Sequence, residues 1–76
     1  MNLILYSRAD CELCGKAEAL LAEGGLSKAY EIVDIESDVE LLKRYHDQIP
    51  VLLNRDTGEK LTWPFTVSQV RDLANV

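Results

Sequence analysis

Short apolar runs alternate with amphipathic segments along this chain, and this alternation limits the fold more than any other feature. The runs at 2–6, 29–35 and 50–54 are rich in strand-forming residues, and a brief fourth strand is expected at 60–62. The run 2–6 shows no polar–apolar alternation, which is typical of a strand buried on both faces. Turn-forming residues at 55–59 separate the last two strands.

Three amphipathic helices are expected between and after these strands. Asp10 is the expected N-cap of the first, and the glycine pair 24–25 is expected to end it. Its apolar stripe falls at helical spacing on Leu13, Ala17, Leu20 and Leu21. The segments 37–40 and 66–69 have the Ser/Thr-x-x-Glu/Gln pattern of a capping box, so each predicts the start of a further helix. The second helix is expected to bury Val39, Leu41, Leu42 and Tyr45.

The predicted element order is therefore β-α-β-α-β-β-α. Strands separated by helices are expected to pair in parallel, and the two strands joined by a tight turn are expected to pair antiparallel. A four-stranded mixed sheet flanked by three helices satisfies these rules in a single α/β domain spanning residues 1–76. At 76 residues the chain is too short for a second domain.

The charge distribution excludes several classes of partner. The formal net charge of −5 repels phosphate, and the only adjacent basic pair is Lys43-Arg44, so neither nucleic acid nor a membrane is an expected partner. The first ten residues lack a basic segment followed by a long apolar core, so we expect no targeting peptide and a cytoplasmic location. A monomer is expected.

Cys11 and Cys14 are the only cysteines, and they lie where the first strand gives way to the first helix. A helix N-terminus stabilises a thiolate, the form of cysteine that attacks disulfides. Cys14 falls one helical turn deeper, within reach of Cys11. Arg8 adds positive charge near Cys11, whereas Asp10 and Glu12 oppose it, so we expect only a modestly lowered Cys11 pKa. Cys-x-x-Cys beside a β-α-β pattern predicts a redox-active pair.

A metal site and a structural disulfide are the alternatives for this pair. Zinc needs four ligands, and beyond the cysteines the chain offers carboxylates and His46, which falls at the far end of the second helix. A dimer would supply a second cysteine pair, so metal or iron–sulfur carriage through a dimer stays open. A permanent disulfide is the weakest alternative, because cytoplasmic thiols are kept reduced and so short a closed loop gains little stability.

Gly15 lies inside the first expected helix, where glycine costs about 1 kcal/mol relative to alanine. Two interpretations stay open. Either the fold tolerates this cost, or the helix backbone closely approaches another segment here, such as the one that carries Pro50.

The stretch "LYSRADCELC" (5–14) resembles the opening of glutaredoxins, in which a strand, a basic residue three positions before the first cysteine, and Cys-x-x-Cys follow in order. "IPV" (49–51) matches the place where that superfamily carries a cis-proline. The chain is thus similar to small bacterial glutaredoxin-like proteins of the thioredoxin fold. The resemblance implies a thiol–disulfide oxidoreductase or electron carrier of cell redox homeostasis.

The resemblance also assigns residue roles. Cys11 would be the nucleophile and Cys14 the resolving thiol. Pro50 would be the substrate-facing cis residue, and the backbone of Ile49 would pair with an extended substrate. Arg8 is a candidate for attracting anions near the thiolate, and Trp63 is a candidate for the rim of the site, although packing in the core is the simpler role for Trp63.

Two departures from the glutaredoxin pattern affect the expected partners. Glu-Leu stands between the cysteines, and the segment 62–69 lacks the Gly-Gly-acid motif with which glutaredoxins hold glutathione. We expect no bound cofactor, a disulfide-containing protein or small thiol as substrate, and glutathione or a thioredoxin-type protein as reductant. A non-catalytic binding or adaptor module of the same fold is the alternative function, besides metal carriage.

Overall fold

The computed structural model describes residues 2–27 and 29–74. Its helices and strands follow the predicted order, with a short 3-10 helix added before the second α-helix. The elements are β1 (Leu3–Ser7), α1 (Glu12–Glu23), β2 (Glu31–Asp34), η1 (Ile35–Ser37), α2 (Val39–Tyr45), β3 (Val51–Asn54), β4 (Lys60–Thr62) and α3 (Val67–Ala74). The second strand is shorter than the predicted 29–35. At its C-terminal end Asp34 caps η1 by accepting a hydrogen bond from the Glu36 N–H, so the strand ends there.

The four strands form one mixed sheet in the order β2-β1-β3-β4. β1 runs parallel to β2 across the α1 crossover, and the β3–β4 hairpin is antiparallel, as predicted. The expectation that helix-separated strands pair in parallel is wrong for β3, which pairs antiparallel with β1. The reason is that β2 ends beside Ser7 and β3 begins beside Tyr6, so η1 and α2 stay at one end of the sheet and β3 runs back from there.

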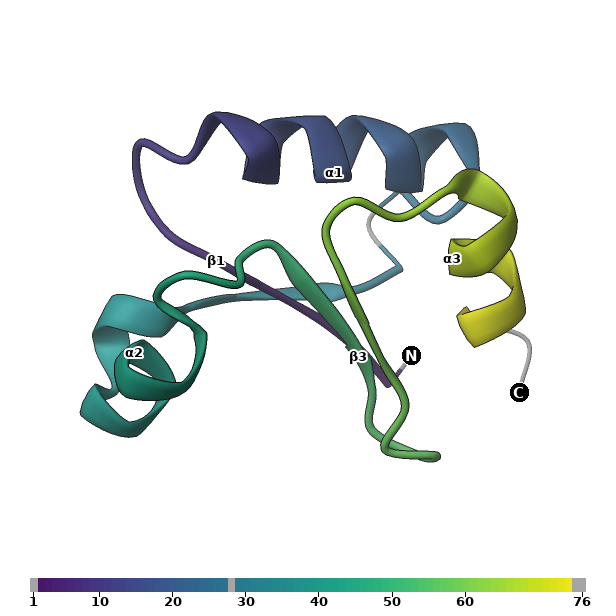
Figure 1. The fold of residues 1–76 in the computed structure, drawn as a ribbon. Coiled ribbons are helices and arrows are strands. Elements are labelled where there is room, and N and C mark those ends of the chain that lie inside the picture. Colours follow the sequence, from purple (N-terminus) through teal and green to yellow (C-terminus); the bar gives the residue numbers. More distant parts are fainter. Residues whose placement is uncertain (1, 28, 75–76) are drawn as a thin grey trace.

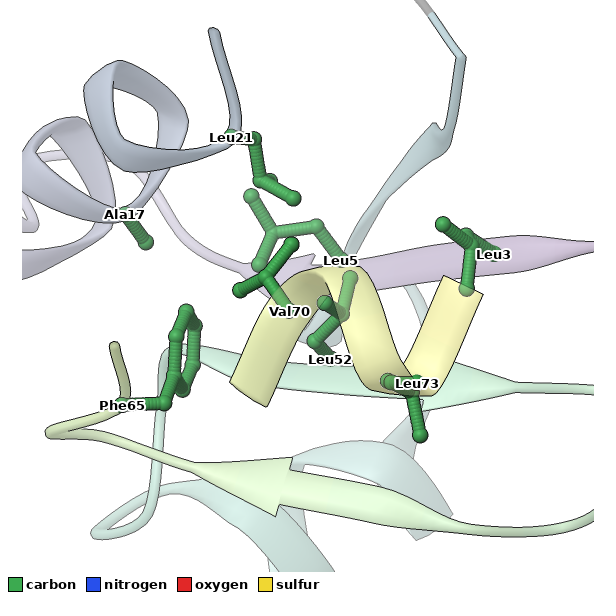
Figure 2. Packing of buried hydrophobic residues seen from close by; sticks show 8 residues of the cluster. All are labelled: Leu3, Leu5, Ala17, Leu21, Leu52, Phe65, Val70 and Leu73. Carbon is green, nitrogen blue, oxygen red and sulfur yellow. The ribbon is translucent and has the colours of Figure 1, made fainter. Parts of the chain in front are cut away.

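Helices cover both faces of the sheet, with α1 and α3 on one side and α2 on the other (Figure 1). The larger core cluster lies under α1 and α3 and contains Leu3, Leu5, Ala17, Leu21, Leu52, Phe65, Val70 and Leu73. Figure 2 shows Leu5, Leu52 and Val70 meeting at its centre. A smaller cluster on the α2 face contains Ile35, Tyr45 and Val51, with Tyr6, Leu41, Leu42 and Ile49 packed against it. Both faces of β1 are therefore buried, as its apolar run predicts.

Two of the predicted helix caps are wrong, and each differs by one residue. Asp10 has φ 60°, a left-handed conformation, whereas Cys11 has the extended backbone of an N-cap and caps α1. Ser37 belongs to η1, so Asp38 takes the N-cap position of α2 and accepts a hydrogen bond from the Glu40 N–H. The capping box at 66–69 is confirmed: the Thr66 N–H donates to Gln69 Oε1, and the Gln69 N–H donates to Thr66 Oγ1.

The predicted apolar stripes are only partly buried. Ala17 and Leu21 are buried and Leu20 packs against the same cluster, but Leu13 is 42% exposed. Val39, whose side chain was expected to be buried by α2, is 66% exposed. Leu13 is the second residue of α1 and Val39 is the first residue of α2, so both lie in the first turn of their helices.

Gly15 meets no other backbone, because a Cβ built at this position has no neighbour within 4 Å. The close-approach interpretation is therefore wrong. We expect Gly15→Ala to raise the free energy of unfolding by about 0.5 to 1 kcal/mol, through helix propensity and reduced freedom of the unfolded chain. Urea unfolding curves measure the change.

Gly58 is the matched control for that substitution. It lies in the β3–β4 turn with φ +78°, a left-handed conformation that alanine adopts only at a cost. Gly58→Ala should lower the free energy of unfolding by about 1 kcal/mol. Equal signs for the two glycine substitutions would contradict this assignment.

Candidate active site

The loop from β1 to α1 places the cysteine pair at the N-terminus of α1. Cys11 is the N-cap residue, and its Sγ accepts a hydrogen bond from the Cys14 N–H at 3.1 Å. The two cysteines form a disulfide, with their Cα atoms 5.2 Å apart. An N-cap acceptor satisfies one of the backbone N–H groups that the first helical turn leaves unpaired. Sulfur thus takes the position that a serine or aspartate oxygen occupies in most helices.

The two sulfurs have different surroundings. Cys14 is 3% exposed and lies on the buried face of α1, in line with Ala17 and Leu21. Cys11 is only partly buried, at the end of the helix. The geometry therefore matches the expected arrangement of an accessible sulfur backed by a buried one.

An open hollow of about 470 Å³ lies over the pair, lined by Ser7, Arg8, Asp10, Cys11, Glu12, Cys14, Gly15 and Glu18. Cys11, Cys14 and Arg8 are the predicted site residues among them. Ser7 and Glu18 were not predicted as site residues, although strand and helix periodicity place them near the cysteines. Ser7 follows Leu3 and Leu5 on one face of β1, and Glu18 follows Cys11 and Cys14 at helical spacing.

The hollow carries more negative than positive charge. Asp10, Glu12 and Glu18 are exposed carboxylates in its lining, and Arg8 is the one cation among the described residues that line it. Arg8 is itself paired with Glu36, with 3.2 Å between Nη2 and Oε2. Burial raises the pKa of Tyr30, and the Glu18 carboxylate raises it further.

The strand register brings the segments with Pro50 and Trp63 to the same end of the sheet. Tyr6 pairs with Val51 and Val51 with Thr62, so Ser7, Pro50 and Trp63 come next in line. The Trp63 N–H donates to the Pro50 carbonyl at 3.2 Å. Cross-strand neighbours share a face, and alternate residues of a strand lie on the same face. Two rows back, Leu5, Leu52 and Leu61 are cross-strand neighbours that pack in the α1-side cluster. The proline and the tryptophan therefore lie on the face that α1 covers.

The Ile49–Pro50 peptide bond is cis, as the resemblance implies, and Trp63–Pro64 is a second cis bond that the sequence did not indicate. Pro50 is fully buried, and Trp63 is partly buried in an edge-to-face contact with Phe65. The Ile49 N–H donates to the Tyr45 carbonyl. None of Ile49, Pro50 and Trp63 lines the hollow, and Ile49 packs against the cluster on the α2 face.

Within residues 2–27 and 29–74, no three His, Cys, Asp or Glu side chains are grouped closely enough to hold a metal ion. None of the helices in that part of the chain is long and apolar enough to cross a membrane.

Comparison with known proteins gives one family and two solved structures. The model of the glutaredoxin-like domain (DUF836) matches residues 2–74. The X-ray structure of the Northeast Structural Genomics target protein XcR50 from X. campestris is 36% identical, with a TM-score of 0.84 over 96% of this chain and 95% of that one. The solution structure of XcR50 is likewise 36% identical, with a TM-score of 0.85 over 99% of this chain and 94% of that one. No curated protein matches the sequence. The likeness over nearly the whole chain confirms the predicted thioredoxin-like α/β fold.

Proposed function

This chain belongs to the glutaredoxin-like domain family, and from that premise we propose that it is a thiol–disulfide oxidoreductase that uses the Cys11/Cys14 couple. The observation that carries the proposal is the site of Cys11: its sulfur caps α1 at 3.1 Å from the Cys14 N–H and lines an open hollow. A redox role fits a member of this family whose two cysteines form a disulfide.

The reaction proceeds in two exchanges. The Cys11 thiolate attacks one sulfur of a substrate disulfide, which forms a mixed disulfide and releases the other half of the substrate as a thiolate. Cys14 then loses its proton and attacks the Cys11 sulfur, forming the Cys11–Cys14 disulfide and releasing the second half. Two electrons pass to the substrate, and the two protons lost by the cysteines end on the product thiols.

Local geometry supports the order of the two cysteines. The Cys14 N–H and the positive end of the α1 dipole both lie at the Cys11 sulfur, so they favour its charged form over a neutral thiol. Cys14 is nearly inaccessible to a substrate but is already within bonding distance of Cys11. The attacking sulfur is therefore the more accessible one, and the resolving sulfur is buried behind it.

The proposed partners follow from the same chemistry. The substrate is a disulfide-containing protein or a small disulfide, approached along the segment with Ile49 and Pro50. A thiol donor, either glutathione or a thioredoxin-type dithiol protein, returns two electrons to the oxidised pair. We place the reaction in the cytoplasm, whose thiol pools keep such a couple supplied with electrons.

The test is an equilibrium titration of the cysteine pair in glutathione redox buffers, read by mass after acid quench and alkylation. We expect a reversible loss of two hydrogens with a midpoint in the range of roughly −150 to −300 mV. A pair that stays reduced throughout would instead support the adaptor function. A pair that oxidises only after a bound metal is stripped would support metal carriage.

A further inference from the structure

We infer that the acidic lining of the hollow selects disulfides with positively charged neighbours and disfavours anionic thiols and disulfides. This inference rests on the proposed function, because it concerns the substrate of the same cysteine pair. Asp10, Glu12 and Glu18 are the residues that set the selectivity.

The placement of these carboxylates is what carries the inference. They lie before, between and beyond the two cysteines along the chain, and all three line the hollow through which a substrate reaches Cys11. A disulfide that comes into contact with Cys11 therefore enters a hollow whose lining includes three carboxylates.

The cation in the lining does not offset them. Arg8 Nη2 lies 3.2 Å from Glu36 Oε2, so the positive charge of Arg8 is already matched by a carboxylate outside the hollow. The formal net charge of −5 for the whole chain adds a long-range field of the same negative sign.

Attack and selection depend on different ranges of distance. The hydrogen bond from the Cys14 N–H acts on the Cys11 sulfur alone, over 3.1 Å. The exposed carboxylates act on charged groups of the substrate several ångströms from the reacting sulfur. The site is thus able to stabilise a thiolate at its centre and still repel anions that approach it. Glutathione, with two carboxylates and one ammonium group, is disfavoured by this field, and a dithiol protein with a basic contact surface is the better donor.

The experiment compares three small disulfides as oxidants of the reduced protein: cystamine (cationic), bis(2-hydroxyethyl) disulfide (neutral) and 3,3′-dithiodipropionate (anionic). Rates are measured at low salt by acid quench, alkylation and mass. The cationic and anionic rates are each divided by the neutral rate, so that general changes in Cys11 reactivity cancel. Because every variant meets the same reagents, differences in their intrinsic reactivity also cancel when variants are compared.

The variants are a double substitution, Glu12→Gln with Glu18→Gln, and a control, Glu23→Gln, which removes an exposed carboxylate from the far end of α1. We expect the double substitution to lower the cationic-to-anionic rate ratio about tenfold at low salt, and Glu23→Gln to change it less than about twofold. Added salt near 1 M should shrink the wild-type ratio toward that of the double variant, because the screening length then falls to about 3 Å.

The outcomes separate the two proposals. If none of the three disulfides oxidises the cysteine pair, the proposed function fails and the inference fails with it. If the neutral disulfide reacts but wild type, double variant and control share one cationic-to-anionic ratio, the oxidoreductase function stands and the charge selectivity is overturned.

Discussion

Cys11→Ser should reduce disulfide exchange to the uncatalysed rate while leaving the fold intact. The substitution replaces the only accessible sulfur of the pair by a hydroxyl, which forms no mixed disulfide. Serine is also a preferred N-cap residue, so its Oγ can accept the Cys14 N–H bond that Cys11 Sγ now accepts. The loss of activity is therefore chemical, and an unchanged circular dichroism spectrum shows that α1 still forms.

Cys14→Ser is the partner variant, and its expected phenotype is different. Cys11 still attacks the substrate, but no internal thiol completes the reaction, so the mixed disulfide accumulates. Mass spectrometry after acid quench should show the Cys14→Ser protein carrying half a substrate on Cys11, and the Cys11→Ser protein carrying none. Both variants should be tested with the neutral bis(2-hydroxyethyl) disulfide, so that substrate charge does not affect the comparison.

Two results would count against the assigned roles. Accumulation of the adduct on Cys14 in the Cys11→Ser protein would reverse the order of the cysteines, although Cys14 is only 3% exposed. Undiminished exchange in the Cys11→Ser protein would end the oxidoreductase proposal altogether.

Leu5→Ala should cause the largest loss of stability among single substitutions in the sheet, about 2 to 5 kcal/mol. Leu5 is fully buried in β1, a central strand paired with both β2 and β3, and contributes to the cluster under α1 and α3 (Figure 2). Removing its side chain takes apolar surface out of the core and leaves a cavity among Leu21, Leu52 and Val70. A small domain has a total stability of only about 5 to 15 kcal/mol, so much of the protein should unfold at moderate urea concentrations.

Leu13→Ala is the matched control for this substitution. The same side-chain atoms are removed, but Leu13 is 42% exposed at the start of α1 and lies outside both core clusters. We expect a change within about 0.5 kcal/mol, since surface substitutions away from caps and core contacts seldom exceed it. Urea unfolding of both variants measures the difference. A similar loss at Leu13 and Leu5 would contradict the burial that distinguishes them.

Local sequence determined the elements of this protein and their order. The apolar runs of β1, β2 and β3 are each interpretable by themselves, and β4 was indicated by the turn residues before it, because strand formation depends on neighbouring residues and on turn chemistry at the ends. The capping box at 66–69 was predictable for the same reason, since its two hydrogen bonds join residues three apart. The Cys-x-x-Cys pair at a helix N-terminus likewise needs only the boundary between one strand and one helix.

The predicted N-caps of α1 and α2 were wrong because of small differences in backbone conformation. Aspartate is a preferred N-cap residue, but Asp10 has a left-handed backbone, and Cys11 is the N-cap instead. Asp38, not Ser37, is the N-cap of α2, because Ser37 is the last residue of η1. In both cases two adjacent polar residues could cap the helix, and the path of the preceding chain chose between them.

Only the tertiary structure decided which distant residues lie next to the segment that carries the site. The reversal of β3 places Pro50 beside Ser7, and the β3–β4 pairing then places Trp63 beside Pro50. The pairing of Arg8 with Glu36 likewise joins a loop after β1 to a 3-10 helix after β2.

The physical reason is the range over which each effect acts. Strand, helix and cap propensities are set within a few residues, so the sequence displays them directly. Strand direction and the burial of Cys14 against the exposure of Leu13 depend on how the whole sheet and its helices bury apolar surface together. No short stretch of sequence determines these properties, because they depend on contacts between segments that lie far apart in the chain.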